Sequence, residues 1–182
     1  MSIVIVPASS SWPQEYETLR AKIASVAPKN AQIDHIGSTS VANLPAKDII
    51  DIQMSVDSLE DVDIEALCKI GYVQSAGVKV DHCPPGQELA DDQLQKLFFK
   101  AAEGERKTHL HVREFGKFNQ KYPLLCRDYL RSHPYAAAAY AEIKMQLAKR
   151  FSDDEDSYYD VKDPVFDLIM EGAKEWEKQQ AP

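Results

Sequence analysis

The chain has 182 residues, of which 44% are hydrophobic and 27% are charged, and its net charge is −8. This balance is typical of a globular protein, and the length favours a single domain over residues 1–182. The negative net charge argues against broad nucleic-acid binding, which depends on neutralising many phosphates. A small phosphate-bearing ligand in a local basic pocket remains possible. No apolar run approaches the roughly 18 residues of a membrane span, so we expect no membrane partner.

The beginning of the chain and the cysteines predict the compartment. Residues 1–7 lack both a basic stretch and a long apolar stretch, so we do not expect a signal peptide there. Cys68, Cys83 and Cys126 are odd in number and widely spaced, which indicates free thiols in a reducing compartment. We therefore expect a cytoplasmic protein.

The sequence predicts alternating strands and helices in the first half of the chain. Apolar residues at helical spacing follow Ser11, a plausible N-cap, and Pro28 ends the helix. Gly71 is a helix stop further along. The expected elements are a strand at 2–6, a helix at about 12–27, strands at 32–36 and 48–56, and a helix at 58–70.

The second half begins with strands and continues as helices. The expected elements are one bent strand or two at 72–80, a loop at 84–92, strands at 94–101 and 107–115, and helices at about 117–132, 134–151 and 157–178. Pro134 favours a helix start after His133. This order predicts an α+β fold, with a mixed sheet and a C-terminal helical part over about 117–178.

Two strands have polar faces. Asp51 and Gln53 alternate with apolar residues, so both point to one side of their strand. His109 and His111 share one face in the same way, together with Arg113. We expect Asp51 and the two histidines to face one common cleft.

A glycine-serine turn directly follows the strand at 32–36. Gly37 lets the backbone approach a phosphate, and Ser38, Thr39 and Ser40 supply hydroxyl donors. Asp51, 13 residues after Ser38, could hold a metal ion against that phosphate. The alternative is a capping turn, in which Ser38 or Thr39 starts a short helix.

The histidines have three possible roles. With Asp51 or His82 they could bind a metal. With their cationic neighbours they could bind an anion or carry protons. They could also be half-exposed sheet residues without a ligand. Cys83, beside His82, has none of the partners of a zinc motif.

Arg127 and Arg131 are four residues apart and share a helix face. Their guanidinium groups could clamp a phosphate. The alternative is that they pair with a carboxylate, such as Asp128 or Glu142, and hold helices together. Tyr140 and its apolar neighbours are expected in the core.

Several motifs together resemble the GrpB-like family. They occur in order from Val6 to about Lys162 and are specific only as a set: Ser11-Trp12-Pro13, His35-Ile36-Gly37-Ser38-Thr39-Ser40-Val41, Leu44-Pro45-Ala46-Lys47, Ile49-Ile50-Asp51-Ile52, His109-Leu110-His111-Val112 and Arg127-Asp128-Tyr129-Leu130-Arg131-Ser132-His133-Pro134. The resemblance implies a fold of the nucleotidyltransferase superfamily. In some bacteria the family is fused to dephospho-coenzyme A kinase.

The resemblance implies a nucleotidyltransferase that binds a nucleotide or another phosphate-bearing small molecule. Asp51 would be catalytic, and Asp51 and Gln53 would hold Mg²⁺. Because Gln53 replaces the second carboxylate of the superfamily pattern, restoring it with Gln53→Glu or Gln53→Asp is expected to strengthen metal binding. The alternative is a catalytically degenerate binding or accessory module linked to coenzyme A metabolism. The expected phosphate-binding residues are Gly37, Ser38, Thr39, Ser40, Lys47, His109, His111, Arg113, Arg127 and Arg131.

Overall fold

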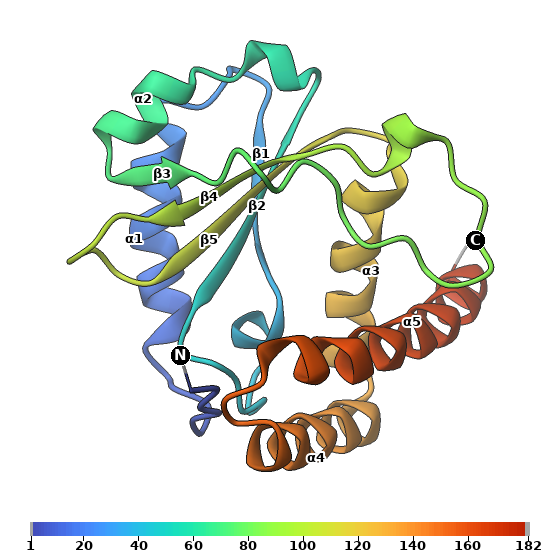
Figure 1. Ribbon diagram of the computed structural model, residues 1–182. Helices are drawn as coiled ribbons and strands as arrows, with labels where there is room; N and C mark the ends of the chain where they lie inside the picture. The colour runs from blue at the N-terminus through green and yellow to red at the C-terminus, as the bar shows by residue number, and fades with distance from the viewer. Residues whose placement is uncertain (1, 181–182) are drawn as a thin grey trace.

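A five-stranded sheet forms the centre of the computed structural model, which describes residues 2–180 (Figure 1). Its strand order is β1-β2-β5-β4-β3. The pair β2 and β5 is parallel, whereas β1–β2, β4–β5 and β3–β4 are antiparallel. The sheet is therefore mixed, and the predicted α+β fold is confirmed. The strands are β1 (Gln32–Ile36), β2 (Ile50–Val56), β3 (Tyr72–Gln74), β4 (Leu97–Ala101) and β5 (Thr108–Glu114).

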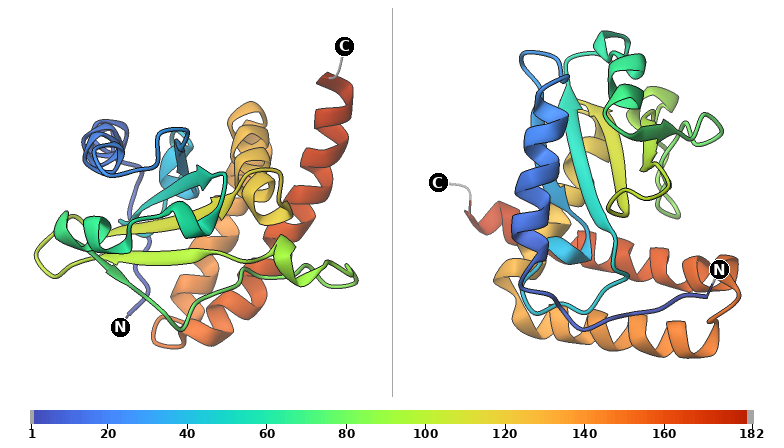
Figure 2. Two further views of the ribbon diagram at one scale, coloured as in Figure 1. Left: turned by 90° about the horizontal axis from the view of Figure 1, so that it is seen from above. Right: turned by 90° about the vertical axis from the view of Figure 1, so that its left-hand side faces the viewer.

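Three long helices follow the sheet in the chain. Helices α4 and α5 lie next to each other beneath one end of the sheet, and α3 connects the sheet to them (Figures 1 and 2). The α-helices are α1 (Trp12–Ala24), α2 (Ile64–Lys69), α3 (Phe118–Ser132), α4 (Pro134–Arg150) and α5 (Glu155–Gln180). Three short 3₁₀ helices are η1 (Ser38–Ser40), η2 (Leu59–Asp61) and η3 (Asp91–Gln93).

The main core lies between α1 and one face of the sheet. Trp12, Tyr16, Leu19 and Ile23 recur at helical spacing, so they form one buried stripe along α1. They pack against the apolar face of β2 and β5, whose members include Ile50, Ile52, Met54, Leu110 and Val112. Because side chains alternate along a strand, burying these residues directs Asp51 and His109 to the opposite face.

The predicted pairing of strands 32–36 and 48–56 is confirmed as an antiparallel ladder. Two predicted elements are wrong, and a third is only partly present. Residues 2–6 contribute a single bridge, between Val6 and Ala46, and no full strand. The predicted helix at 58–70 splits because the Asp63 side chain accepts from Ala66 N and starts α2 anew. Of the one or two strands predicted over 72–80, the structure has β3, which ends at Gln74, and a single bridge between Val80 and Gln95.

Two further sequence predictions concern the whole chain. Within residues 2–180, Cys68, Cys83 and Cys126 are free thiols, as predicted. Over the same residues, each helix is too short or too polar to cross a membrane.

Candidate functional site

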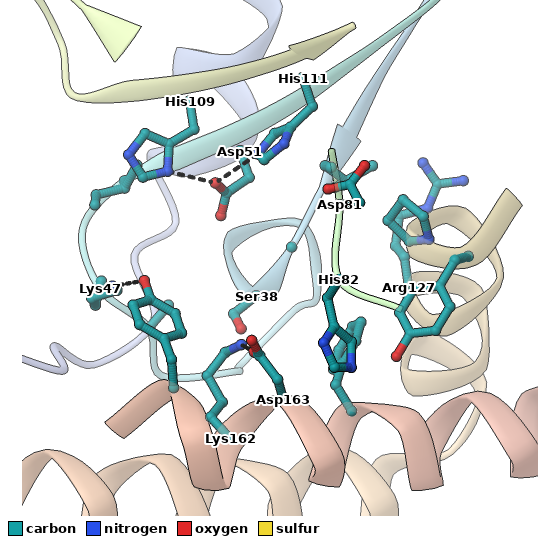
Figure 3. Close-up of a pocket in the computed structure, with 18 of the residues that line it drawn as sticks. Ser38, Lys47, Asp51, Asp81, His82, His109, His111, Arg127, Lys162 and Asp163 are labelled. Carbon is teal, nitrogen blue, oxygen red and sulfur yellow. Dashed lines mark hydrogen bonds and ion pairs between the residues drawn. The ribbon is translucent and has the colours of Figure 1, made fainter. Parts of the chain in front are cut away.

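Two parallel neighbouring strands bring a carboxylate and two imidazoles together. Asp51 on β2 lies opposite His109 on β5, and Gln53 lies opposite His111. Asp51 Oδ1 is 3.2 Å from His109 Nδ1 and 3.9 Å from His111 Nε2 (Figure 3). This grouping is as predicted from the strand alternation. Within the described residues, these three side chains form the one group of three or more histidines, cysteines and carboxylates that are close enough to share a metal ion.

The electrostatics of this cluster follow from its burial. Burial alone would raise the pKa of Asp51, but the neighbouring imidazoles of His109 and His111 lower it well below its usual range. Burial, together with the charge of Arg113, lowers the pKa of His111 to about 4. At neutral pH the cluster therefore contains an ionised carboxylate and a neutral His111 imidazole.

The buried Phe98 ring packs against both imidazoles. The Phe98 ring on β4 lies 5.3 Å from the His109 ring and 4.8 Å from the His111 ring. Its position follows from the register, because Phe98 pairs with His111 across the β4–β5 ladder. This packing restricts the imidazole rotamers.

The turn after β1 is built around Gly37. Its φ of 67° and ψ of −170° lie in a region that residues with a Cβ rarely adopt. A Cβ placed there would lie 2.6 Å from Asp51 Oδ2. The backbone of the turn therefore packs directly on the carboxylate, as the antiparallel pair Ile36–Asp51 requires.

The three hydroxyls that follow Gly37 have different partners. Ser38 Oγ accepts from Lys144 Nζ at 2.8 Å and faces the cavity (Figure 3). Thr39 Oγ1 is 2.9 Å from His35 Nε2, and Ser40 Oγ donates to Gly37 O at 2.6 Å. Ser38 therefore keeps the exposure that a phosphate donor needs, whereas Thr39 and Ser40 hold the turn in shape.

A lysine that the sequence analysis missed completes the turn. Lys144 on α4 is 2% exposed, and its ammonium also donates to Pro45 O at 2.7 Å. Burial lowers the pKa of Lys144 to about 7, and the charge of Lys162 adds to this effect, whereas Asp51 opposes it. A buried ammonium of this kind gains strongly from a bound anion.

The cluster, the Gly37 turn and Lys144 line one cavity of about 420 Å³, which is within the range of small-molecule sites. Lysines and arginines outnumber carboxylates in its wall, although the chain as a whole is acidic. The cationic lining residues are Lys47, Lys96, Arg113, Arg127, Lys144 and Lys162, and the carboxylates are Asp51, Asp81 and Asp163. The cavity thus attracts an anion locally against the net charge of the protein.

Gln53 is fully buried and has protein partners. Its carboxamide oxygen accepts from Arg113 Nη1 at 2.6 Å, and its nitrogen donates to Gln120 O at 2.9 Å. Arg113 is itself held by Asp81, at 2.7 and 3.0 Å. The structure therefore places the Gln53 side chain in an internal network beside the cluster, where its oxygen already accepts a hydrogen bond from Arg113.

This placement changes the expected result of Gln53→Glu. The new carboxylate would pair with Arg113, and one of its oxygens would face the Gln120 carbonyl in place of the amide donor. We expect no gain in metal affinity and a loss of about 1 to 3 kcal/mol in the free energy of unfolding. Denaturant unfolding and metal titration of the variant check this, and tighter metal binding would contradict the placement.

Of the remaining predicted cations, Lys47 and Arg127 line the cavity, whereas Arg131 is not among its lining residues. Arg127 lines the cavity but pairs with Asp34 at 3.3 Å and with Asp128 at 2.8 Å. Arg131 donates to Ser40 O at 2.8 Å and stabilises the turn. Arg127 thus makes the carboxylate pairs of the alternative interpretation, whereas Arg131 bonds a backbone carbonyl and lies 3.7 Å from the Asp128 carboxylate. Lys47 Nζ donates to the Tyr159 hydroxyl at 2.5 Å.

His82 lies across the cavity from the cluster. Its Nε2 is 2.9 Å from Asp167 Oδ2 on α5, and Figure 3 shows it apart from Asp51. Of the two predicted metal partners for the histidine pair, the structure places Asp51 next to the pair and His82 at a separate wall.

Comparison with known proteins identifies the family. The family model described as "GrpB protein" matches residues 2–172. The chain belongs to the GrpB family. The glutamate-rich protein GrpB of Alkalihalophilus pseudofirmus is 30% identical, over 92% of this chain and 94% of its own. The crystal structure of conserved protein GrpB from Enterococcus faecalis has a TM-score of 0.76 and 28% identity, and the match covers 95% of this chain and 99% of that one.

Other relatives of this chain are longer. A dephospho-CoA kinase of Mycolicibacterium paratuberculosis is 29% identical over 94% of this chain, which covers 46% of the relative. The chain thus spans about half the length of the first curated relatives that it matches.

Proposed function

We propose that the protein binds a nucleotide or a similar phosphate-bearing small molecule in the cavity between β2, β5 and α4. The observation that carries the proposal is the contact of Lys144 with Ser38. The buried Lys144 ammonium and the Ser38 hydroxyl, which faces the cavity, lie 2.8 Å apart at a glycine turn. Both can donate to one phosphate group there.

Charge and size support this ligand class. Lys162, whose Nζ lies 2.6 Å from Asp163, and Lys47 both line the same cavity (Figure 3). A phosphate chain could therefore extend along several cations. The aromatic rings of Tyr158, Tyr159 and Phe166, which also line the cavity, offer apolar surface to a base or a pantetheine-like group.

Nucleotidyl transfer is the second candidate, favoured by Gly37-Ser38 and Asp51 at the positions of the superfamily pattern. Transfer by two Mg²⁺ ions needs several hard oxygen ligands. The cluster offers one carboxylate and two imidazoles, and the Gln53 oxygen accepts from Arg113. These residues do not fit a pair of Mg²⁺ ions.

The binding proposal is tested by calorimetric titration of the full chain with ATP and with inorganic pyrophosphate. We expect saturable binding in the wild type and about tenfold weaker binding in Ser38→Ala, because a donor to a charged group is lost. Ser10→Ala, an exposed serine in a turn, is the matched control and should bind as the wild type does. Equal loss in both variants, or no binding of either probe, would overturn the proposal.

A link to coenzyme A metabolism is the alternative suggested by the relatives named dephospho-CoA kinase. Dephospho-coenzyme A belongs in the same titration series for this reason. Binding at least as tight as that of ATP, with the same dependence on Ser38, would favour an accessory role in that pathway.

A further inference from the structure

We propose that Asp51, His109 and His111 bind one divalent ion of a borderline transition metal, such as Zn²⁺ or Fe²⁺, on the sheet wall of the cavity. Two imidazoles and one carboxylate suit these ions, whereas Mg²⁺ prefers oxygen ligands. The proposed site needs no bound phosphate compound, so it can be tested separately from the ligand proposed above.

The geometry of the three donors is close to that of a loaded site. Their donor atoms all lie within 4.8 Å of one another, and His109 Nδ1 and Asp51 Oδ1 are 3.2 Å apart. Bonds of about 2.0 to 2.2 Å place neighbouring ligand atoms roughly 3 to 4 Å apart. Small side-chain rotations would therefore close the site around one ion.

The backbone holds these donors on rigid elements. His109 and His111 are two residues apart on β5, and Asp51 lies opposite His109 on the neighbouring parallel strand. Phe98 packs against both imidazoles. Three ligands on one wall leave the remaining coordination positions open toward the cavity, which is the arrangement of catalytic rather than structural metal sites.

Arg113 is the neighbour whose contact with His111 has to lengthen when a metal binds. Its Nη2 lies 3.3 Å from His111 Nδ1 and faces it as a donor. A metal on His111 Nε2 leaves the imidazole proton on Nδ1, so this contact must lengthen. Asp81 and Gln53 hold the guanidinium through its other nitrogens, and they keep it in place when the imidazole turns.

The test is metal binding by the full chain after chelator treatment, without nucleotide. Equilibrium dialysis followed by elemental analysis should find one Zn²⁺ per chain, bound more tightly than Mg²⁺. Asp51→Asn, His109→Ala and His111→Ala should each weaken Zn²⁺ binding at least about 100-fold, since even the outer partners of a metal site contribute 10- to 100-fold. His82→Ala removes an imidazole from the same cavity and should leave the affinity unchanged.

Substoichiometric Zn²⁺, preference for Mg²⁺, or an equal loss in His82→Ala would overturn the proposal. A measurement on the wild type keeps the test valid if a variant fails to fold. With Co²⁺ bound, proton NMR should show two hyperfine-shifted, exchangeable imidazole N–H signals, one for each histidine ligand. A Co²⁺ complex without such signals would exclude His109 and His111 as ligands.

Discussion

Gly37→Ala should abolish binding of a phosphate-bearing ligand and reduce the free energy of unfolding by about 3 kcal/mol. The positive φ of Gly37 is strained for a residue with a Cβ, at a cost of roughly 1 to 3 kcal/mol. The added Cβ would also lie 2.6 Å from Asp51 Oδ2, so the turn or the carboxylate must move. Denaturant unfolding and calorimetric titration with pyrophosphate measure the two effects.

Gly104→Ala separates the two causes. Gly104 has a φ of 85°, and a Cβ there would meet no described residue within 4 Å. This control carries the backbone strain without the contact, so it should lose stability but retain ligand binding. If Gly37→Ala binds as well as Gly104→Ala, the contact between the turn and Asp51 does not shape the site.

Lys144→Met should weaken ligand binding roughly 10- to 100-fold, because a charge-assisted hydrogen bond contributes about 1.5 to 3 kcal/mol. The free energy of unfolding should fall by at most about 1 to 3 kcal/mol, because Pro45 O loses its donor, while removal of a buried charge offsets part of this loss. Lys149→Met changes an exposed lysine on the same helix and serves as the control. Titration with ATP compares the variants, and equal affinities of Lys144→Met and the wild type would exclude Lys144 from the site.

The same lysine predicts a pH dependence of binding. Burial and the charge of Lys162 lower the pKa of Lys144 in the free protein to about 7, and the charge of Asp51 opposes this lowering. Binding of a phosphate favours the protonated ammonium, so the affinity should fall as the pH rises above 7, by at most about tenfold per unit. Lys144→Met should lack this decline between pH 7 and 9. A decline of the same slope in the variant would assign the titration to another group.

The cluster could be predicted from sequence because strand periodicity is local. Asp51 alternates with buried residues on β2, and His109 and His111 do so on β5, so their faces could be predicted before their partners were known. That β2 and β5 are neighbours is a long-range fact. The alternation of side chains does not determine which strands pair. The motifs shared with the family only lead us to expect that Asp51 and the histidines lie together.

Lys144 and Lys162 were missed although the sequence contains a signal for both. Lys144 lies four residues after Tyr140 and three before Leu147, within the buried stripe of α4. Lys162 likewise lies four residues after the buried Tyr158. A lysine inside an apolar helical stripe indicates that its ammonium has polar surroundings inside the protein. Here those surroundings are the cavity wall.

Gln53 shows the limit of pattern matching. The superfamily pattern suggested a weakened metal ligand at this position, and the strand face was predicted correctly. The side chain, however, is used by Arg113 and the Gln120 carbonyl, which come from distant parts of the chain. Such a network depends on tertiary contacts that neither spacing nor composition contains.

Binding of a phosphate group between Ser38 and Lys144 is the basis of the proposed function. It is tested most directly by thermal unfolding of the wild type and Lys144→Met with ATP, pyrophosphate and dephospho-coenzyme A, since a ligand specific to the native state raises the melting temperature. We predict that at least one of these compounds raises the melting temperature of the wild type and that the increase is lost in Lys144→Met. No increase with any compound, or an equal increase in the variant, would contradict the claim.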